Sequence, residues 1–359
     1  SWALVPDCGP KDIDLAVEAA KNAFYSGHWG KMMPAERGRY LRKIGEIISK
    51  HAERIGKIET TDNGKLPRNI TPSLLKDSWQ VDSWHYYSGM CDKFEGRVIP
   101  AEAPDIHNYL KWEPFGVVAQ VLPWNSPIGT LIWKLAPCLA AGNTVVLKPS
   151  EFASCSTLEL MDVLLEANLP PGVINVVTGF GNKIVEPLVD HEDVRMVSFT
   201  GGTNGGRIVA GIAAKSAKPT VMELGGKSPQ IVLPDCDLEI AVNGIISGIF
   251  PAAGQSCISG SRLLIHENVI EEFTNLDKSS NELEYLTTES GEYYLAPWCF
   301  VSDQMIYHDY IGWIPETKNK ISLKIGQKLA FLTVSDECAL HSEFESSIKS
   351  LLIISCLLL

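Results

Sequence analysis

The stretch that decides the fold runs from residue 116 to residue 147. It reads GVVAQVL (116–122), then LIWKLAPCLAA (131–141), then TVVL (144–147). The first and last segments are continuous apolar runs of strand length, and the middle segment carries apolar residues at helical spacing. A buried strand, a helix and a second buried strand form the repeating unit of a parallel sheet that is covered on both faces. We therefore predict a doubly wound, Rossmann-like α/β domain around this stretch.

The same alternation of apolar strands and helices continues toward the C-terminus. It predicts helices over 156–167, 182–189 and 204–214 and strands over 173–177, 195–199 and 220–222. On the N-terminal side, the pattern predicts helices over 12–24 and 34–61, and a β-hairpin arm with strands at 97–100 and 107–112.

Composition excludes several classes of protein. The 359 residues are enough for about two domains. With 31 Lys and Arg against 43 Asp and Glu, the net charge of −12 argues against nucleic acid and anionic membranes as partners. No apolar run approaches the roughly 20 residues needed to span a bilayer. The nine cysteines are scattered without CxxC pairs, which predicts reduced thiols, a cytoplasmic protein and no metal site.

The composition changes near residue 275. No arginine follows Arg262, and the alternation of strands and helices stops. Residues 276–359 therefore form either a divergent domain or an aberrant tail of scrambled or frame-shifted coding sequence, and we favour the tail.

Polar motifs follow several of the predicted strands, where open α/β sheets bind their ligands. GGTNGG (201–206) comes after a strand and opens a helix, which suits a phosphate group, although most glycine-rich turns are only tight turns. KPSE (148–151) ends a buried strand, where a cation and a carboxylate can meet a ribose and a phosphate or can simply form a solvated turn.

Three further residues are candidates for chemistry. Cys257 stands among small residues near the end of a helical stretch that begins around residue 238; most lone cysteines are small core residues. Glu223 closes the last predicted strand and is either a base or an exposed carboxylate. Asn125 follows the predicted strand at 116–122. Its side-chain amide either points toward the end of that strand as a hydrogen-bond donor, or the residue simply turns the chain.

Taken together, the motifs are more specific than any one of them. In chain order they are PWN (123–125), KPSE (148–151), FTGGT (199–203), ELGGKSP (223–229) and GQSC (254–257). This series resembles the aldehyde dehydrogenase superfamily over residues 12–270. The resemblance implies a small-molecule substrate, an aldehyde that is oxidised to a carboxylic acid with NAD as the hydride acceptor, through a cysteine thiohemiacetal and a thioester.

The resemblance also implies a role for each matching residue. Cys257 would be the nucleophile, the Asn125 amide and the backbone N–H of Cys257 the oxyanion hole, and Glu223 the general base. Trp133 and Lys134 match a pair near the family's substrate tunnel, or else serve core packing and surface charge. The cofactor-binding residues would be Trp124, Lys148, Glu151, Gly181, Gly201, Gly202, Thr203, Gly206 and Leu224. A carboxylate at Glu151 would repel a 2′-phosphate and so favour NAD over NADP.

The implied domains are a dinucleotide-binding domain (1–95 and 115–225), an oligomerisation arm (96–114) and the start of an α/β catalytic domain (226–275). Segment 276–359 would be an incomplete catalytic domain or the aberrant tail, because the family's later EEIFGP-like segment is not found. A full-length parent would form homo-oligomers; for this chain, assembly is left open. The alternatives to the enzyme are a non-catalytic truncated remnant and an NAD-independent esterase that uses Cys257 and Glu223.

Overall fold

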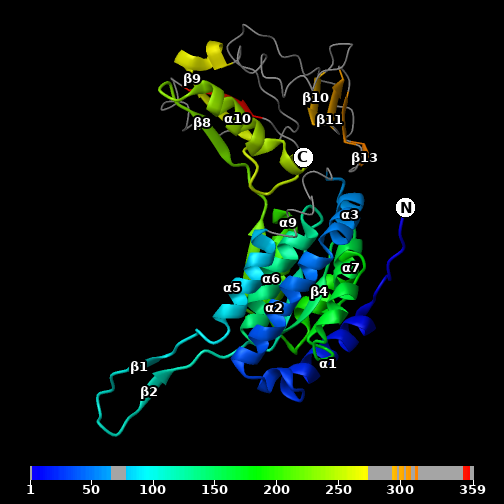
Figure 1. Cartoon of the computed structure of the whole chain (residues 1–359), viewed down its shortest axis with the longest axis vertical. Coiled ribbons are helices and arrows are strands. Elements are labelled where there is room, and N and C mark those ends of the chain that lie inside the picture. Colours follow the sequence, from blue (N-terminus) through cyan, green and yellow to red (C-terminus); the bar gives the residue numbers. More distant parts are fainter. Residues whose placement is uncertain are drawn as a thin grey trace. The chain divides into compact units, whose positions relative to one another are not determined.

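The computed structural model describes residues 2–65 and 78–273 and, beyond them, only the backbone of five short strands. The chain divides into two units, residues 1–224 and 225–359 (Figure 1). The predicted divergent segment, 276–359, lies outside the described residues except for those strands. The assignment of domain roles stays a prediction.

The first unit is built on a five-stranded parallel sheet, which confirms the predicted α/β class. Its strands, in spatial order, are β5 (Ile174–Val176), β4 (Thr144–Lys148), β3 (Val117–Val121), β6 (Val194–Gly201) and β7 (Thr220–Leu224). The chain starts at the central strand β3, moves outward to β5 and then crosses back to β6. The order of the strands therefore reverses between β3 and β6, and ligands bind at such a switch point in open α/β sheets.

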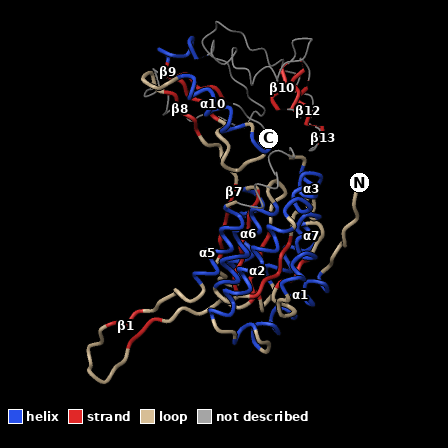
Figure 2. The backbone as a smooth tube through the Cα atoms, in the orientation of Figure 1, coloured by secondary structure: helices blue, strands red, loops and turns tan. Residues whose placement is uncertain are grey.

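Helices cover both faces of this sheet (Figure 2). Val118 of β3 belongs to one apolar core, and its neighbours Val117 and Ala119 belong to the other, as the two-residue period of a strand requires. The helices of the first core are α2 (Pro34–Lys50), α3 (Ala52–Asn63), α5 (Trp79–Met90), α6 (Pro127–Ala140) and α7 (Cys155–Leu164). Those of the second core are α1 (Pro10–Tyr25), α8 (Gly181–Asp190) and α9 (Thr203–Lys215).

The predicted arm is present as a two-stranded antiparallel hairpin. Strands β1 (Arg97–Ile99) and β2 (Asn108–Leu110) pair only with each other. They are shorter than the sequence predicts, and their side chains are mostly exposed, Val98 by 75% and Tyr109 by 63%. Apolar side chains at the surface of such a hairpin provide a surface that another protein could cover.

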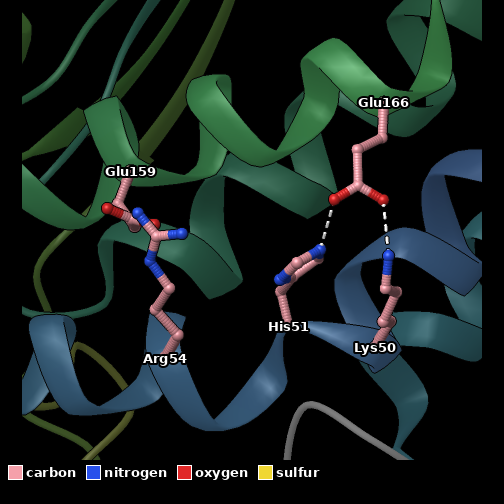
Figure 3. A network of polar contacts seen from close by, with 5 residues as sticks. All are labelled: Lys50, His51, Arg54, Glu159 and Glu166. Carbon is pink, nitrogen blue, oxygen red and sulfur yellow. Dashed lines mark hydrogen bonds and ion pairs between the residues drawn. The ribbon is translucent and has the colours of Figure 1, made fainter.

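One predicted helix is two helices in the structure. The sequence predicts a single helix over 34–61, but α2 ends at Lys50 and α3 begins at Ala52, with His51 between them at φ −103° and ψ 13°. Polar contacts with a side chain from a helical turn much later in the chain hold this junction (Figure 3). Glu166, in the 3-10 turn after α7, accepts hydrogen bonds from Lys50 Nζ at 2.8 Å and from His51 Nε2 at 2.7 Å. These two hydrogen bonds lower the pKa of Glu166.

In the part that the structure describes, the second unit contains a three-stranded sheet and a helix of 12 residues. Strand β9 (Arg262–His266) pairs in parallel with β8 (Pro229–Val232) and in antiparallel fashion with β14 (Leu351–Ser355). Helix α10 (Leu238–Ile249) packs on the sheet through a small apolar core. The remaining strands form an antiparallel sheet of β10 (Tyr293–Ala296), β11 (Cys299–Ser302), β12 (Met305–His308) and β13 (Gly312–Trp313). Among the helices of the described ranges, none is long and apolar enough to cross a membrane.

Candidate active site

The loop after β3 carries the first candidate residues, Trp124 and Asn125. It runs from the end of β3 to Pro127, which occupies the first turn of α6, where its missing N–H costs nothing. Both residues are half-buried, and the backbone oxygen of Asn125 accepts a hydrogen bond of 3.2 Å from the side chain of Asn63. The structure thus places Asn125 at the carboxyl end of the central strand.

The glycine-rich turn follows β6, the strand that pairs with β3, so it leaves the sheet next to the loop that carries Asn125. Strand β6 extends to Gly201, two residues beyond the predicted end, so that Gly202 alone links it to α9. No side chain caps the N-terminus of α9, and a Cβ built on Gly202 would meet no atom within 4 Å. The first N–H groups of an uncapped helix, next to an open backbone, form a suitable place for an anion.

Two of the predicted cofactor glycines have a packing reason to be glycine. A Cβ on Gly201 would lie 2.7 Å from the ring of Phe199, and a Cβ on Gly206 would lie 2.5 Å from Leu224 Cδ2. Leu224 therefore supports the first turn of α9 from the neighbouring strand β7. Gly206→Ala would force the Leu224 side chain to move.

Lys148 and Glu151 form a fixed pair after β4. Lys148 Nζ lies 2.6 Å from Glu151 Oε2, and the N–H of Gly181, at the start of α8, donates to Glu151 Oε1 over 3.1 Å. Burial is the largest single influence and would raise the pKa of Glu151, but the hydrogen bonds from Lys148 and from backbone N–H groups, together with the charge of Lys148, outweigh it, and the net pKa is lowered. The predicted cofactor residues Lys148, Glu151 and Gly181 are therefore in contact around an ionised carboxylate.

Glu223 lies within strand β7, whereas the sequence predicts that it follows the strand. β7 runs to Leu224 because Thr200 and Gly201 of the longer β6 continue to pair with Glu223 and Leu224. The Glu223 side chain is exposed, and its charge acts on Lys134 of α6. Glu223 therefore has a cation nearby inside the first unit.

Lys134 is a buried cation with an unusual titration range. It is 8% exposed, and its Nζ donates to Ser198 Oγ of β6 over 2.6 Å. Burial lowers the pKa of Lys134 from the ordinary 10.5 to about 8, and the negative charge of Glu223 partly opposes this shift. Lys134 can therefore change its protonation state close to neutral pH.

The neighbouring Trp133 points away from this buried environment. It is 59% exposed, and its ring lies 4.9 Å from that of Trp79 at the start of α5. The sequence drew attention to Trp133 but not to Trp79, because no motif links residues of two separate helices. Together they form an exposed aromatic pair on the first unit.

Cys257 lies in the second unit, in a turn that follows a short 3-10 helix at Pro251–Gly254. Helix α10 stops at Ile249, well before Cys257, because the chain turns sharply at residues 252–254. Ala252 and Ala253 both have φ 57°, a left-handed conformation that is costly for alanine, and Gly254 follows with φ 71°. The Cys257 side chain is exposed and belongs to no disulfide.

The structure brings two of the quoted motifs together within the second unit. A Cβ built on Gly226 of ELGGKSP would lie 3.1 Å from the backbone oxygen of Cys257. Gln230 Nε2 donates to the Gly260 oxygen over 2.7 Å, and the Arg262 N–H donates to the Ser228 oxygen over 3.2 Å. The backbone beyond Glu223 therefore supports the cysteine loop, and a larger residue at 226 would press on the backbone oxygen of Cys257.

Sequence reasoning missed one polar cluster that touches the Asn125 loop. It consists of Glu59, Asn63 and Lys65, all buried, at the C-terminal end of α3. A signal was available, because Glu59 falls four residues after Ile55, on the apolar face of its helix.

Comparison with known proteins identifies the family. The sequence model of the aldehyde dehydrogenase family matches residues 1–291. The chain is 41% identical over 272 residues to (Z)-2-((N-methylformamido)methylene)-5-hydroxybutyrolactone dehydrogenase of Acinetobacter baylyi, covering 76% of this chain and 55% of the relative. It is 37% identical over 295 residues to the betaine aldehyde dehydrogenase of Bacillus subtilis, covering 80% and 60% respectively. The chain belongs to the aldehyde dehydrogenase family.

Solved structures agree with this assignment. The NAD⁺ complex of an aldehyde dehydrogenase from Bacillus cereus superposes with a TM-score of 0.74 at 40% identity, covering 78% of this chain and 57% of that one. The family match begins before, and ends after, the residues 12–270 over which the motifs show the resemblance. The chain spans a little over half the length of these relatives.

Proposed function

We propose that this chain belongs to an enzyme that oxidises an aldehyde to a carboxylic acid with NAD as the hydride acceptor. The observation that carries the proposal is the arrangement at the carboxyl edge of the parallel sheet. Asn125 follows β3, the Lys148–Glu151 pair follows β4 and the glycine-rich turn follows β6, in the part of the sheet where its strand order reverses. The betaine aldehyde dehydrogenase and the NAD⁺ complex among its relatives support the same reaction.

The residues at this edge fit a dinucleotide. The uncapped N-terminus of α9 beside Gly202 would receive the pyrophosphate, and the ionised Glu151 would accept hydrogen bonds from ribose hydroxyls. Thr200 Oγ1 is buried without a hydrogen-bond partner in the described part of the chain, so it can bond to a ligand group. Trp124, Gly181, Gly201, Thr203, Gly206 and Leu224 complete the proposed cofactor site. When bound, NAD supplies the acceptor for a hydride.

Cys257 would begin the reaction as a thiolate. Its Sγ adds to the aldehyde carbon, the carbon–oxygen π bond breaks, and the oxygen takes the negative charge. The side-chain amide of Asn125 and the backbone N–H of Cys257 would donate to this oxygen. When the carbonyl re-forms, the carbon–hydrogen bond breaks and the hydride leaves with its electron pair, so that a thioester remains on Cys257.

Glu223 would act in the second half of the reaction. A water molecule adds to the thioester carbon while Glu223 takes one of its protons, the carbon–sulfur bond breaks, and the carboxylic acid leaves. The charge of Lys134, the buried cation of α6, interacts with this carboxylate.

The proposal is tested by incubating the 359-residue chain with NAD and a set of small aldehydes. We expect NADH and the matching carboxylic acid to form in equal amounts. NAD binding without NADH would favour the non-catalytic alternative, and acid formation from esters without NAD would favour the esterase alternative.

We further propose that the arm supports homo-oligomers of a full-length parent and that the protein works in a reducing compartment such as the cytoplasm. The exposed apolar side chains of the β1–β2 hairpin provide the surface for self-association. The six cysteines in the described residues are free thiols.

The choice between NAD and NADP should depend on Glu151. Glu151→Gln removes the charge that would repel a 2′-phosphate but keeps an oxygen for the Gly181 N–H. We expect the ratio of the NADP Kd to the NAD Kd to fall by roughly tenfold, the equivalent of about 1.4 kcal/mol. Fluorescence titration of both nucleotides measures this ratio without requiring turnover.

A matched control is Glu186→Gln on α8, which removes an exposed carboxylate that pairs with Lys215. This control should leave the ratio unchanged. An unchanged ratio in Glu151→Gln as well would refute the role of Glu151.

The buried ammonium of Lys134 should make stability depend on pH. Its pKa is about 8 in the folded protein and close to the ordinary 10.5 in the unfolded chain. Between these values the unfolded chain binds more protons, so the free energy of unfolding should rise with pH. Relative to Lys134→Met, which lacks this group, the wild type should gain about 3 kcal/mol between pH 7 and pH 10.5. Urea unfolding of both proteins across this range measures the difference, and parallel pH profiles would contradict the assignment.

A further inference from the structure

We infer that Glu59, Asn63 and Lys65 are positioning residues that hold the loop carrying Asn125 in place for the reaction. We call these three residues the α3 cluster. The inference rests on the proposed role of the Asn125 amide, and it assigns a function to a part of the chain that none of the five motifs includes.

The α3 cluster contacts the loop at three separate points. Asn63 Nδ2 donates to the backbone oxygen of Asn125 over 3.2 Å, and Lys65 Nζ donates to Ser126 Oγ over 2.7 Å. The Glu59 carboxylate also interacts with the backbone of Ile128, and this interaction acts to lower the pKa of Glu59. These contacts begin at the proposed oxyanion donor and end in the first turn of α6, so they fix both the loop and the helix that follows it.

The contact with Ile128 fills a gap left by the local sequence. Ser126 is the N-cap residue of α6, but its side chain makes no capping hydrogen bond, and Pro127 offers no N–H. The first N–H groups of a helix need acceptors and attract negative charge. Glu59 brings a carboxylate from another helix to this start of α6, where it interacts with the backbone of Ile128.

The members of the cluster also hold one another. Asn63 Nδ2 lies 3.4 Å from Glu59 Oε1, the Lys65 N–H donates to Asn63 Oδ1 over 3.1 Å, and Lys65 Nζ lies 3.8 Å from Glu59 Oε1. Their exposed fractions are only 4%, 5% and 9%. Burial raises the pKa of Glu59 and lowers that of Lys65, and each charge opposes the shift of the other.

Such an arrangement is expensive to bury. A buried ion pair often contributes no more to stability than apolar residues of the same volume. A buried, hydrogen-bonded pair instead fixes the positions of the groups that it contacts, because each hydrogen bond holds one group at one place. Here the fixed groups belong to the loop from which the Asn125 amide projects, and a donor misplaced by about 1 Å loses much of its value to a transition state.

Hydrogen exchange tests the positioning itself, without any need for activity. Lys65→Met keeps the length of the side chain but removes its bond to Ser126. Ser126→Ala removes the same bond while leaving the charged pair intact. The control is Lys57→Met, an exposed lysine on the same helix. We expect both test variants to exchange the amides of segment 124–130 at least tenfold faster, with strand β4 unchanged. Exchange equal to that of the control would overturn the inference.

Kinetics then separate positioning from plain stabilisation. Lys65→Met should lower kcat by roughly tenfold, leave the KM for NAD unchanged, and have no further effect when combined with Asn125→Ala, since both changes act through the same group, the Asn125 amide. Additive losses in the double variant would show that the cluster does not act through Asn125. If the wild-type chain forms no NADH, the proposed function fails, and the exchange experiment still decides whether the cluster holds the loop.

Discussion

Cys257→Ser should abolish NADH formation while the Kd for NAD stays close to that of the wild type. The substitution replaces the proposed nucleophile with a hydroxyl, which is a far poorer nucleophile at neutral pH, so turnover should fall by roughly 10³-fold or more. The residues proposed to hold NAD lie in the first unit of the chain and are left intact. Steady-state NADH formation and NAD titration measure the two quantities.

The control is Cys236→Ser, because Cys236 is also an exposed, free cysteine of the second unit. It should retain wild-type turnover. If Cys257→Ser retained it too, Cys257 would be an ordinary surface cysteine and the proposed chemistry would be wrong.

Glu223→Gln should slow the overall reaction by roughly 10²-fold, the cost expected for removing a positioned general base. If Glu223 serves hydrolysis of the thioester, the variant should still give one rapid burst of NADH and then stall. If it chiefly deprotonates the Cys257 thiol, the burst itself should disappear. Stopped-flow measurement of NADH distinguishes these outcomes.

Glu18→Gln provides the matched control, because Glu18 is an exposed carboxylate on α1. It should behave as the wild type in both phases. A Glu223→Gln variant with the same burst and the same steady rate would show that Glu223 is only an exposed carboxylate of strand β7.

The sheet could be predicted from the sequence because its strands are buried on both faces. GVVAQVL and TVVL are continuous apolar runs, and the structure places both at the centre of the parallel sheet. The predicted ends of helices and strands were less accurate. Glu223 lies within β7 because pairing with β6 extends that strand, and the helix over 34–61 breaks at His51 because contacts with Glu166 hold a junction there.

The candidate site could be predicted only in part. Motifs locate residues that act next to one another in the chain, and the Lys148–Glu151 pair is of that kind. The α3 cluster depends instead on a contact between residues 63 and 125, which no local pattern encodes. The sequence also did not predict that α10 ends early. Residues 252 and 253 are both alanine, and alanine gives no sign of the left-handed backbone that the structure has there.

The central claim is that an aldehyde is oxidised while it is bound covalently to Cys257. Peptide mass spectrometry of the Glu223→Gln variant, quenched after one turnover with an aldehyde and NAD, tests it most directly. We predict an acyl group on the peptide that contains Cys257, present only when both NAD and the aldehyde have been added. An acyl group on another cysteine, or none at all while NADH is formed, would contradict the claim.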